Sequence, residues 1–262
     1  MNDHILKKGV VLVDKPSGMT SFDVVEKACR VLGISKAGHA GTLDPNVTGL
    51  MLIALEEARK AMPVLMGMDK AYVGKMLLHK DVDKKTLEAA FRKFTGEIVQ
   101  KPPVKSRVAR VERTRKIHSL KILKIEGREV GFEVLCEAGT YIRKLVHDIG
   151  QSLASGAHMT ELRRTKIGPF EIGEAVELSN LSEKNVFPLE KALERVGLGK
   201  VVVNDEAIAK IRNGSPVFPD FIIKREKAEE NQTLGIFDRS GSIIALGKKA
   251  GDKIKTERVF LF

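Results

Sequence analysis

The stretch GHAGTLDPNVTGLMLIAL, residues 38–55, joins a glycine-punctuated loop to an uninterrupted apolar run. In the loop, three glycines and two threonines surround a single acidic residue, Asp44, which is followed by Pro45. Proline disfavours the helical region for the residue before it, and glycines let a second backbone approach closely. The pattern predicts one carboxylate presented rigidly in a cleft. A plain Asp-Pro turn between two elements is the alternative.

Helix and strand signals alternate on both sides of this stretch. Upstream, residues 9–13 read as a strand, and Thr20 and Asp23 form a capping pattern that begins a helix ended by Gly33. The apolar spacing predicts that one face of this helix is buried: Phe22, Val25, Cys29 and Leu32. Downstream, the patterns predict strands at 72–79 and 129–137 and helices at 56–66, 139–153 and 159–164. Because the helices and strands do not alternate regularly as βαβ units, this order predicts an α+β (mixed α/β) fold.

Near Lys200 the sequence pattern changes from an irregular connection to short β-rich runs. Residues 171–199 read as an irregular connection with one helix at 189–196. Short runs rich in β-formers then alternate with turns: VVVN, FIIK, TLGIFD, SIIALGK and RVFLF. This pattern predicts a small β-barrel domain at the C-terminal end.

The formal charge of +11 is unevenly placed. Residues 101–124 contain nine basic residues and a single acid, Glu112, a net charge of +8. Such a segment favours binding of a polyanion such as RNA. The alternative is a solvated basic face without a partner. The basic residues are Lys101, Lys105, Arg107, Arg110, Arg113, Arg115, Lys116, Lys121 and Lys124.

Several classes of protein are disfavoured by composition. No stretch approaches the run of about 20 apolar residues that spans a bilayer, and the first twenty residues lack a signal-peptide core, so we expect a cytoplasmic protein. Two cysteines make neither a disulfide framework nor a zinc site, and His147 and His158 lack partners at metal-ligand spacing. Hydrolase, phosphate-loop and dinucleotide signatures are absent from the sequence.

Tryptophan and tyrosine are scarce in this chain. The chain has no tryptophan and two tyrosines, Tyr72 in KAYVG (70–74) and Tyr141 in EAGTYIRKL (137–145). An aromatic ring near a carboxylate in a basic protein suits a base that is swung out of its stack and held against the ring. Core packing with a satisfied hydroxyl is the alternative for each tyrosine.

These segments, in this order, resemble the TruB/dyskerin family of pseudouridine synthases over nearly the whole chain. The matching motifs are VDKPSGMTS, GHAGTLDPNVTGL, KAYVG and EAGTYIRKL. The archaeal and eukaryotic dyskerin branch is resembled most by QKPPVKS and GAHMTELRRTKIGPF. The C-terminal residues resemble a PUA domain. The resemblance implies a catalytic domain at 1–197 and a PUA RNA-binding domain at 198–262.

The same resemblance implies roles for three residues. Asp44 takes the place of the catalytic aspartate, Tyr72 of the tyrosine that stacks on the target uracil, and Arg143 of the arginine that pairs with the aspartate. The reaction breaks the C1′–N1 bond and joins C1′ to C5 without a redox change, so no cofactor or metal is expected. Whether the carboxylate attacks the sugar, attacks the base or assists elimination stays open.

The expected partner is RNA. The enzyme would act with a box H/ACA guide RNA and its small proteins on ribosomal RNA, or alone on the T-arm loop of tRNA. Lys15 is expected to give structural support, and His39 to contact RNA, order the loop or serve as a satisfied structural histidine. A non-catalytic RNA-binding protein with a PUA domain is the competing hypothesis. The expected RNA contacts are His39, Arg107, Arg110, Arg113, Arg163 and Arg164.

Overall fold

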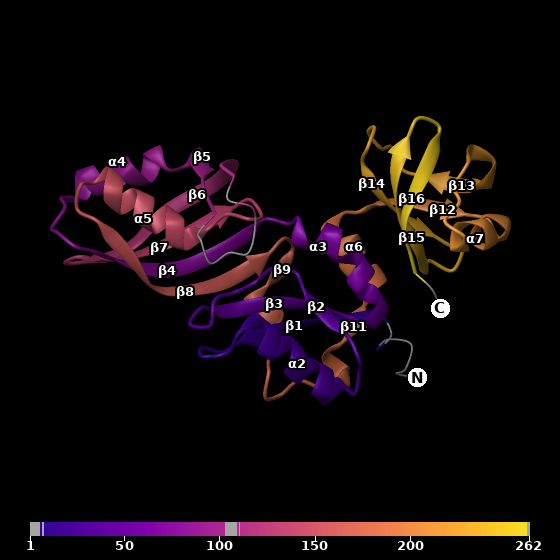
Figure 1. The fold of residues 1–262 in the computed structure, drawn as a ribbon, viewed down its shortest axis with the longest axis horizontal. Helices are drawn as coiled ribbons and strands as arrows, with labels where there is room; N and C mark the ends of the chain where they lie inside the picture. The colour runs from indigo at the N-terminus through magenta and orange to yellow at the C-terminus, as the bar shows by residue number, and fades with distance from the viewer. Residues whose placement is uncertain (1–5, 7, 103–108, 110, 261–262) are drawn as a thin grey trace.

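The computed structural model describes residues 6, 8–102, 109 and 111–260. In this part of the chain the backbone forms an eleven-stranded sheet and a separate five-stranded sheet (Figure 1). The main path of the larger sheet runs β10-β1-β3-β8-β4-β7-β6-β5. Helices pack on this large mixed sheet, which confirms the predicted α+β class.

The first half of the large sheet is built on β1 (Gly9–Lys15) and β3 (Thr48–Leu55), which pair antiparallel. Helix α2 (Ser21–Leu32) lies between them in sequence and begins with the predicted capping box at Thr20 and Asp23. It ends at Gly33, whose φ of 64° is left-handed. Three short strands complete this half: β2 (Ala37–His39), β10 (Val176–Glu177) and β11 (Phe187–Pro188).

The second half is a curved antiparallel array covered by two helices that lie side by side (Figure 1). Helix α5 packs on β8, and α4 contacts β6. The strands are β4 (Lys70–Leu78), β5 (Gly96–Gln100), β6 (Arg113–Glu126), β7 (Glu129–Cys136), β8 (Ala157–Ile167) and β9 (Phe170–Glu171). The helices are α4 (Lys84–Lys93) and α5 (Ile142–Ser152).

The two halves meet where β3 runs parallel to β8. The register pairs Thr48 with Arg163 and Gly49 with Arg164. A Cβ on Gly49 would lie 2.3 Å from the carbonyl oxygen of Arg164, and its φ is 107°, so this junction needs glycine. The junction therefore places the two arginines directly beside the strand that follows the Asp44 loop.

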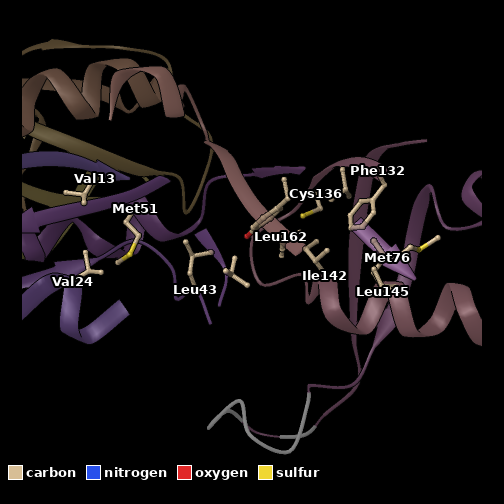
Figure 2. Close-up of a cluster of buried hydrophobic side chains, with 14 of the residues drawn as sticks. Val13, Val24, Leu43, Met51, Met76, Phe132, Cys136, Ile142, Leu145 and Leu162 are labelled. Atoms are coloured by element: carbon tan, nitrogen blue, oxygen red, sulfur yellow. The ribbon is translucent and has the colours of Figure 1, made fainter. Parts of the chain in front are cut away.

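One hydrophobic cluster crosses this junction. Figure 2 shows Val24 and Met51 on one side and Ile142, Leu145 and Phe132 on the other. Leu43, which is 4% exposed, lies between the two groups. The residue that precedes Asp44 is therefore anchored in the core.

Two local predictions were wrong. Helix α2 buries Ser21, Val24, Ala28 and Leu32, whereas Phe22 is 72% exposed. The buried face is offset from the predicted one, and Leu32 belongs to both. Residues 159–164, expected to be helical, form the middle of β8, where pairing with β4 overrides local propensity.

The C-terminal sheet has the order β13-β12-β14-β15-β16. It contains the predicted β-rich runs together with a helix, α7 (Asp205–Arg212), that the sequence analysis did not identify. Helix α6 (Leu189–Val196) and α3 (Met62–Met66), which follows the 3₁₀ turn η1 (Glu56–Ala61), lie between the two sheets (Figure 1). The strands are β12 (Gly199–Val203), β13 (Ile222–Arg225), β14 (Thr233–Phe237), β15 (Ile243–Ala250) and β16 (Lys253–Val259).

A second hydrophobic cluster joins the two sheets. Leu193 of α6 and Leu65 of α3 belong to the same buried cluster as Phe237, Leu246 and Phe260 of the C-terminal part. The C-terminal sheet is thus packed against the rest of the chain. No helix in the described ranges is both long and apolar enough to cross a membrane.

Candidate active site

The loop between β2 and β3 brings Asp44 to the first turn of α5. The Nη2 of Arg143 donates a hydrogen bond of 2.6 Å to the Oδ2 of Asp44, although 99 residues separate them in sequence. Both side chains are more than half exposed, at 55% for Asp44 and 63% for Arg143. A charge-assisted contact of this length orients the carboxylate while leaving it open to a ligand.

A buried lysine holds the loop just after Asp44. The side chain of Lys15 is fully buried, and its Nζ donates to the carbonyl oxygens of Pro45 and Val47, both at 2.8 Å, and of Pro16 at 2.9 Å. Burial lowers the pKa of Lys15, whereas the negative charge of Asp44 raises it. These three contacts give Lys15 the structural role expected of it.

The residue just before Asp44 is held by a serine. The Oγ of Ser21 accepts a hydrogen bond from the amide of Leu43 at 2.8 Å and donates to its carbonyl oxygen at 3.0 Å. The amide of Gly18 donates to the carbonyl oxygen of Pro45 at 3.0 Å. The backbone is thus fixed on both sides of Asp44, which preorganises the carboxylate.

The two tyrosines hold different positions near this loop. Tyr72 lies in β4 and is 7% exposed, and burial raises the pKa of its phenol. Tyr141 is the N-cap residue of α5, two residues before Arg143. Its amide donates to the Oε1 of Gln100 at 2.9 Å, and the Nε2 of Gln100 donates back to its carbonyl oxygen at 3.1 Å. This pair of hydrogen bonds fixes the end of α5 that carries Arg143.

The expected RNA contacts lie in different surroundings. His39 is half-buried in β2, and its Nδ1 accepts a hydrogen bond from the amide of Gly41 at 3.3 Å. Burial lowers the pKa of His39, and the nearby charge of Arg164 lowers it further. Arg113 is exposed at the start of β6. Arg107 and Arg110 lie outside the described residues.

The neighbouring arginines of β8 point to opposite faces of the sheet. Arg163 is partly exposed and forms a two-point ion pair with Asp14, with N···O distances of 3.0 and 2.5 Å. Arg164 is 1% exposed. Such burial argues against the direct RNA contact expected of Arg164.

The sequence analysis did not identify Ser21 and Gln100 as parts of the site. Ser21 follows directly on the Met19-Thr20 pair and ends the motif VDKPSGMTS, so its position in a matching motif was a usable signal. Gln100 is 2% exposed at the end of an edge strand, and its sequence context resembles that of an ordinary surface glutamine.

Comparison with known families assigns residues 29–253. Residues 29–142 match the N-terminal domain of the TruB family pseudouridylate synthases. Residues 143–207 match the tRNA pseudouridylate synthase B C-terminal domain, and residues 199–253 match the PUA domain. The match covers the Asp44 loop, Tyr72 and the junction with α5.

Two curated archaeal proteins are similar over most of their length. Both are named "Probable tRNA pseudouridine synthase B", one from Methanopyrus kandleri and one from Methanocaldococcus jannaschii. Each is 42% identical to this chain, and the alignments cover 94% of this chain and 77% of the relative.

Solved structures show the same fold. The matching chain of a Cbf5–Nop10–Gar1 complex aligns over 100% of this chain and 87% of its own, with a TM-score of 0.88 and 37% identity. A chain of an H/ACA RNP bound to a substrate RNA aligns over 99% of this chain and 87% of its own, with a TM-score of 0.86 and 36% identity. The chain therefore belongs to the TruB family of pseudouridine synthases, isomerases that convert uridine to pseudouridine in RNA, and carries a C-terminal PUA domain.

Proposed function

We propose that this enzyme isomerises specific uridines in ribosomal RNA under the direction of a guide RNA, in the T-arm loop of tRNA, or in both, with Asp44 as the catalytic carboxylate. The observation that carries the proposal is the 2.6 Å contact between Arg143 and Asp44 on a loop fixed from both sides. An ionised, oriented and accessible carboxylate is what each route to pseudouridine requires.

The chemistry needs few groups. The C1′–N1 bond breaks, the uracil turns, the C1′–C5 bond forms, the proton on C5 leaves and N1 gains a proton. Asp44 acts at the sugar, at the base or by assisting elimination, and in each case the hydrogen bond from Arg143 orients its carboxylate. Tyr72 of β4 is assigned to stacking on the target uracil. No step requires an external electron acceptor or group donor.

We propose a box H/ACA guide RNA and the small proteins of its particle as partners. Two likenesses support this: the Cbf5–Nop10–Gar1 complex and the H/ACA RNP with substrate RNA both contain a chain of this fold. The names of the curated relatives support tRNA as a substrate. A cytoplasmic location is part of the same proposal. Mapping the pseudouridines that disappear from ribosomal RNA and tRNA on deletion of the gene distinguishes the two substrates.

We further propose that the domains divide at residues 197 and 198, with RNA binding assigned to the second. Helix α6 is capped at Gly197, and β12 starts at Gly199, which supports this division. The Nζ of Lys60 donates to the carbonyl oxygen of Val259 at 2.8 Å, and the shared apolar cluster lies close by. Deleting the PUA domain would expose this cluster, so the role of the PUA domain in RNA binding is best tested in the full chain.

The test of the central proposal is Asp44→Asn, which removes the charge with little change in volume. We expect pseudouridine formation, followed as release of tritium from C5-labelled uridine in RNA, to be abolished while RNA affinity and the circular-dichroism spectrum are kept. Asp81→Asn, at an exposed position after β4, is the matched control and should keep full activity. A clearly active Asp44→Asn variant would refute the assignment of Asp44, whereas a wild-type protein that binds RNA but forms no pseudouridine would favour the non-catalytic hypothesis.

A further inference from the structure

Arg164 lies at the centre of the junction between the two halves of the large sheet. It faces Gly49 of β3 on one side and Tyr72 of β4 on the other, as direct cross-strand partners. Cross-strand partners in a sheet carry their side chains on the same face. The guanidinium of Arg164 is therefore directed toward the same region as the ring of Tyr72, beneath the Asp44 loop.

The contacts of Arg164 join three parts of the site. Its Nε donates to the carbonyl oxygen of Leu50 at 2.7 Å, and its Nη2 donates to that of Gly41 at 3.0 Å. These two carbonyls lie on either side of Asp44 along the chain. The guanidinium also interacts with the phenol of Tyr72, and its positive charge lowers the pKa that burial raises.

Burying this charge is costly. Arg164 is 1% exposed, so its guanidinium is desolvated, and this burial lowers its pKa. Its partners named above are neutral oxygens, which repay less of the desolvation cost than a carboxylate would. Lys70, also buried, lies close enough for its charge and that of Arg164 to repel each other. An apolar side chain would fill the same space at lower cost, so packing alone does not explain an arginine here.

We propose that Arg164 is a positioning residue for the isomerisation. It fixes the position of the Tyr72 ring relative to the Asp44 loop, and it does not contact RNA. The proposal rests on the proposed roles of Asp44 and Tyr72. A planar guanidinium with five donors reaches the two carbonyls and the phenol at once, whereas the compact ammonium of lysine does not. Gly41 leaves room for it, since a Cβ there would lie 3.3 Å from Nη1 of Arg164.

Kinetics separate positioning from RNA contact. Arg164→Lys keeps the positive charge, so a role in RNA binding would survive it in part. We expect its single-turnover rate at saturating RNA to fall about 100-fold, as for a misplaced reacting group, while its Kd for RNA changes less than about threefold. Arg128→Lys, on the turn between β6 and β7, is the matched control and should keep the wild-type rate and Kd. A weakened Kd with an unchanged saturated rate would overturn the proposal.

A second measurement uses the RNA-free protein and does not depend on activity. Because the chain has two tyrosines, Tyr72→Phe and Tyr141→Phe are matched variants, and one of them removes the phenol near Arg164. We expect the NMR signal of the Arg164 Nε–H to shift in Tyr72→Phe and to stay in place in Tyr141→Phe. An unshifted signal in Tyr72→Phe would overturn the proposal, even if Arg164→Lys failed to fold. If the wild-type enzyme proved inactive on every RNA, the proposed function would fall while this contact remained measurable.

Discussion

Replacing Lys15 with methionine tests whether the Asp44 loop depends on a single buried ammonium. The Nζ of Lys15 donates to three carbonyl oxygens within 2.9 Å, two of them on Pro45 and Val47, directly after Asp44. Methionine fills much of the space of the aliphatic stem but donates no hydrogen bond. The variant therefore removes the lysine donor from the carbonyls of Pro16 and Val47, whereas the carbonyl of Pro45 keeps its hydrogen bond from the amide of Gly18.

The expected loss of stability combines two opposing effects. Each buried carbonyl left without a partner costs about 1–3 kcal/mol. Removing the charge recovers part of its desolvation cost, several kcal/mol for a buried ion. We expect a net loss of about 2–4 kcal/mol in the free energy of unfolding, a large share of the roughly 5–15 kcal/mol typical of a folded protein. We also expect the single-turnover rate to fall about 10–100-fold, because the carboxylate is no longer held in place.

Urea unfolding followed by circular dichroism measures the first effect, and tritium release from C5-labelled RNA measures the second. Lys27→Met, at an exposed position of α2, is the matched control and should change neither. If Lys15→Met unfolded at the urea concentration of the control and kept its rate, the loop would be held by other contacts. The reasoning from buried hydrogen bonds would then be refuted.

Three further predictions test the charged groups of the enzyme. Arg143→Ala should lower the single-turnover rate more than the RNA affinity, and Arg143→Lys should restore only part of it; a lysine variant with the wild-type rate would exclude a specific arginine–aspartate pairing. Reversing the charges of Arg107, Arg110 and Arg113 together should weaken RNA binding and flatten its log–log salt dependence by about 0.7 per lost phosphate contact with a single strand; an unchanged slope would place this segment away from RNA. Burial, with a smaller contribution from a neighbouring arginine, lowers the pKa of Lys70 from 10.5 to about 8. Between these two values the folded state binds fewer protons than the unfolded state, so this lysine makes the free energy of unfolding rise with pH by up to about 3 kcal/mol. Urea unfolding of the wild type and Lys70→Met across this pH window should show the rise in the wild type relative to the variant, and equal pH slopes would contradict the lowered pKa.

Local features of the sequence were sufficient for much of the fold. The capping box at Thr20 and Asp23 and the left-handed Gly33 set both ends of α2, as the sequence predicted. The pattern of residues 129–137 predicted β7, and the helix at 189–196 has the bounds expected for α6. These predictions hold because caps and residue periodicity depend on neighbours within one turn or one strand.

The sequence also singled out Asp44 and Arg143, through the Asp-Pro step and through motif resemblance. It did so without any information on their separation in space. Only the fold brings residues 99 apart in sequence to a 2.6 Å contact, because β3 and α5 reach the same place through the pairing of distant strands. Strand pairing depends on the whole sheet, and a local pattern does not specify it.

Arg163 and Arg164 show most clearly what only the tertiary structure decided. In sequence they are two equivalent basic residues in a motif, and both were expected to contact RNA. Residues 159–164 became a strand through pairing with β4, and successive side chains of a strand point to opposite faces. One arginine consequently lies at the surface against Asp14, and the other is buried among the carbonyls of the Asp44 loop. The sequence determined that both positions carry a guanidinium, and the pleat of a strand formed by distant pairing determined which of them supports the active site.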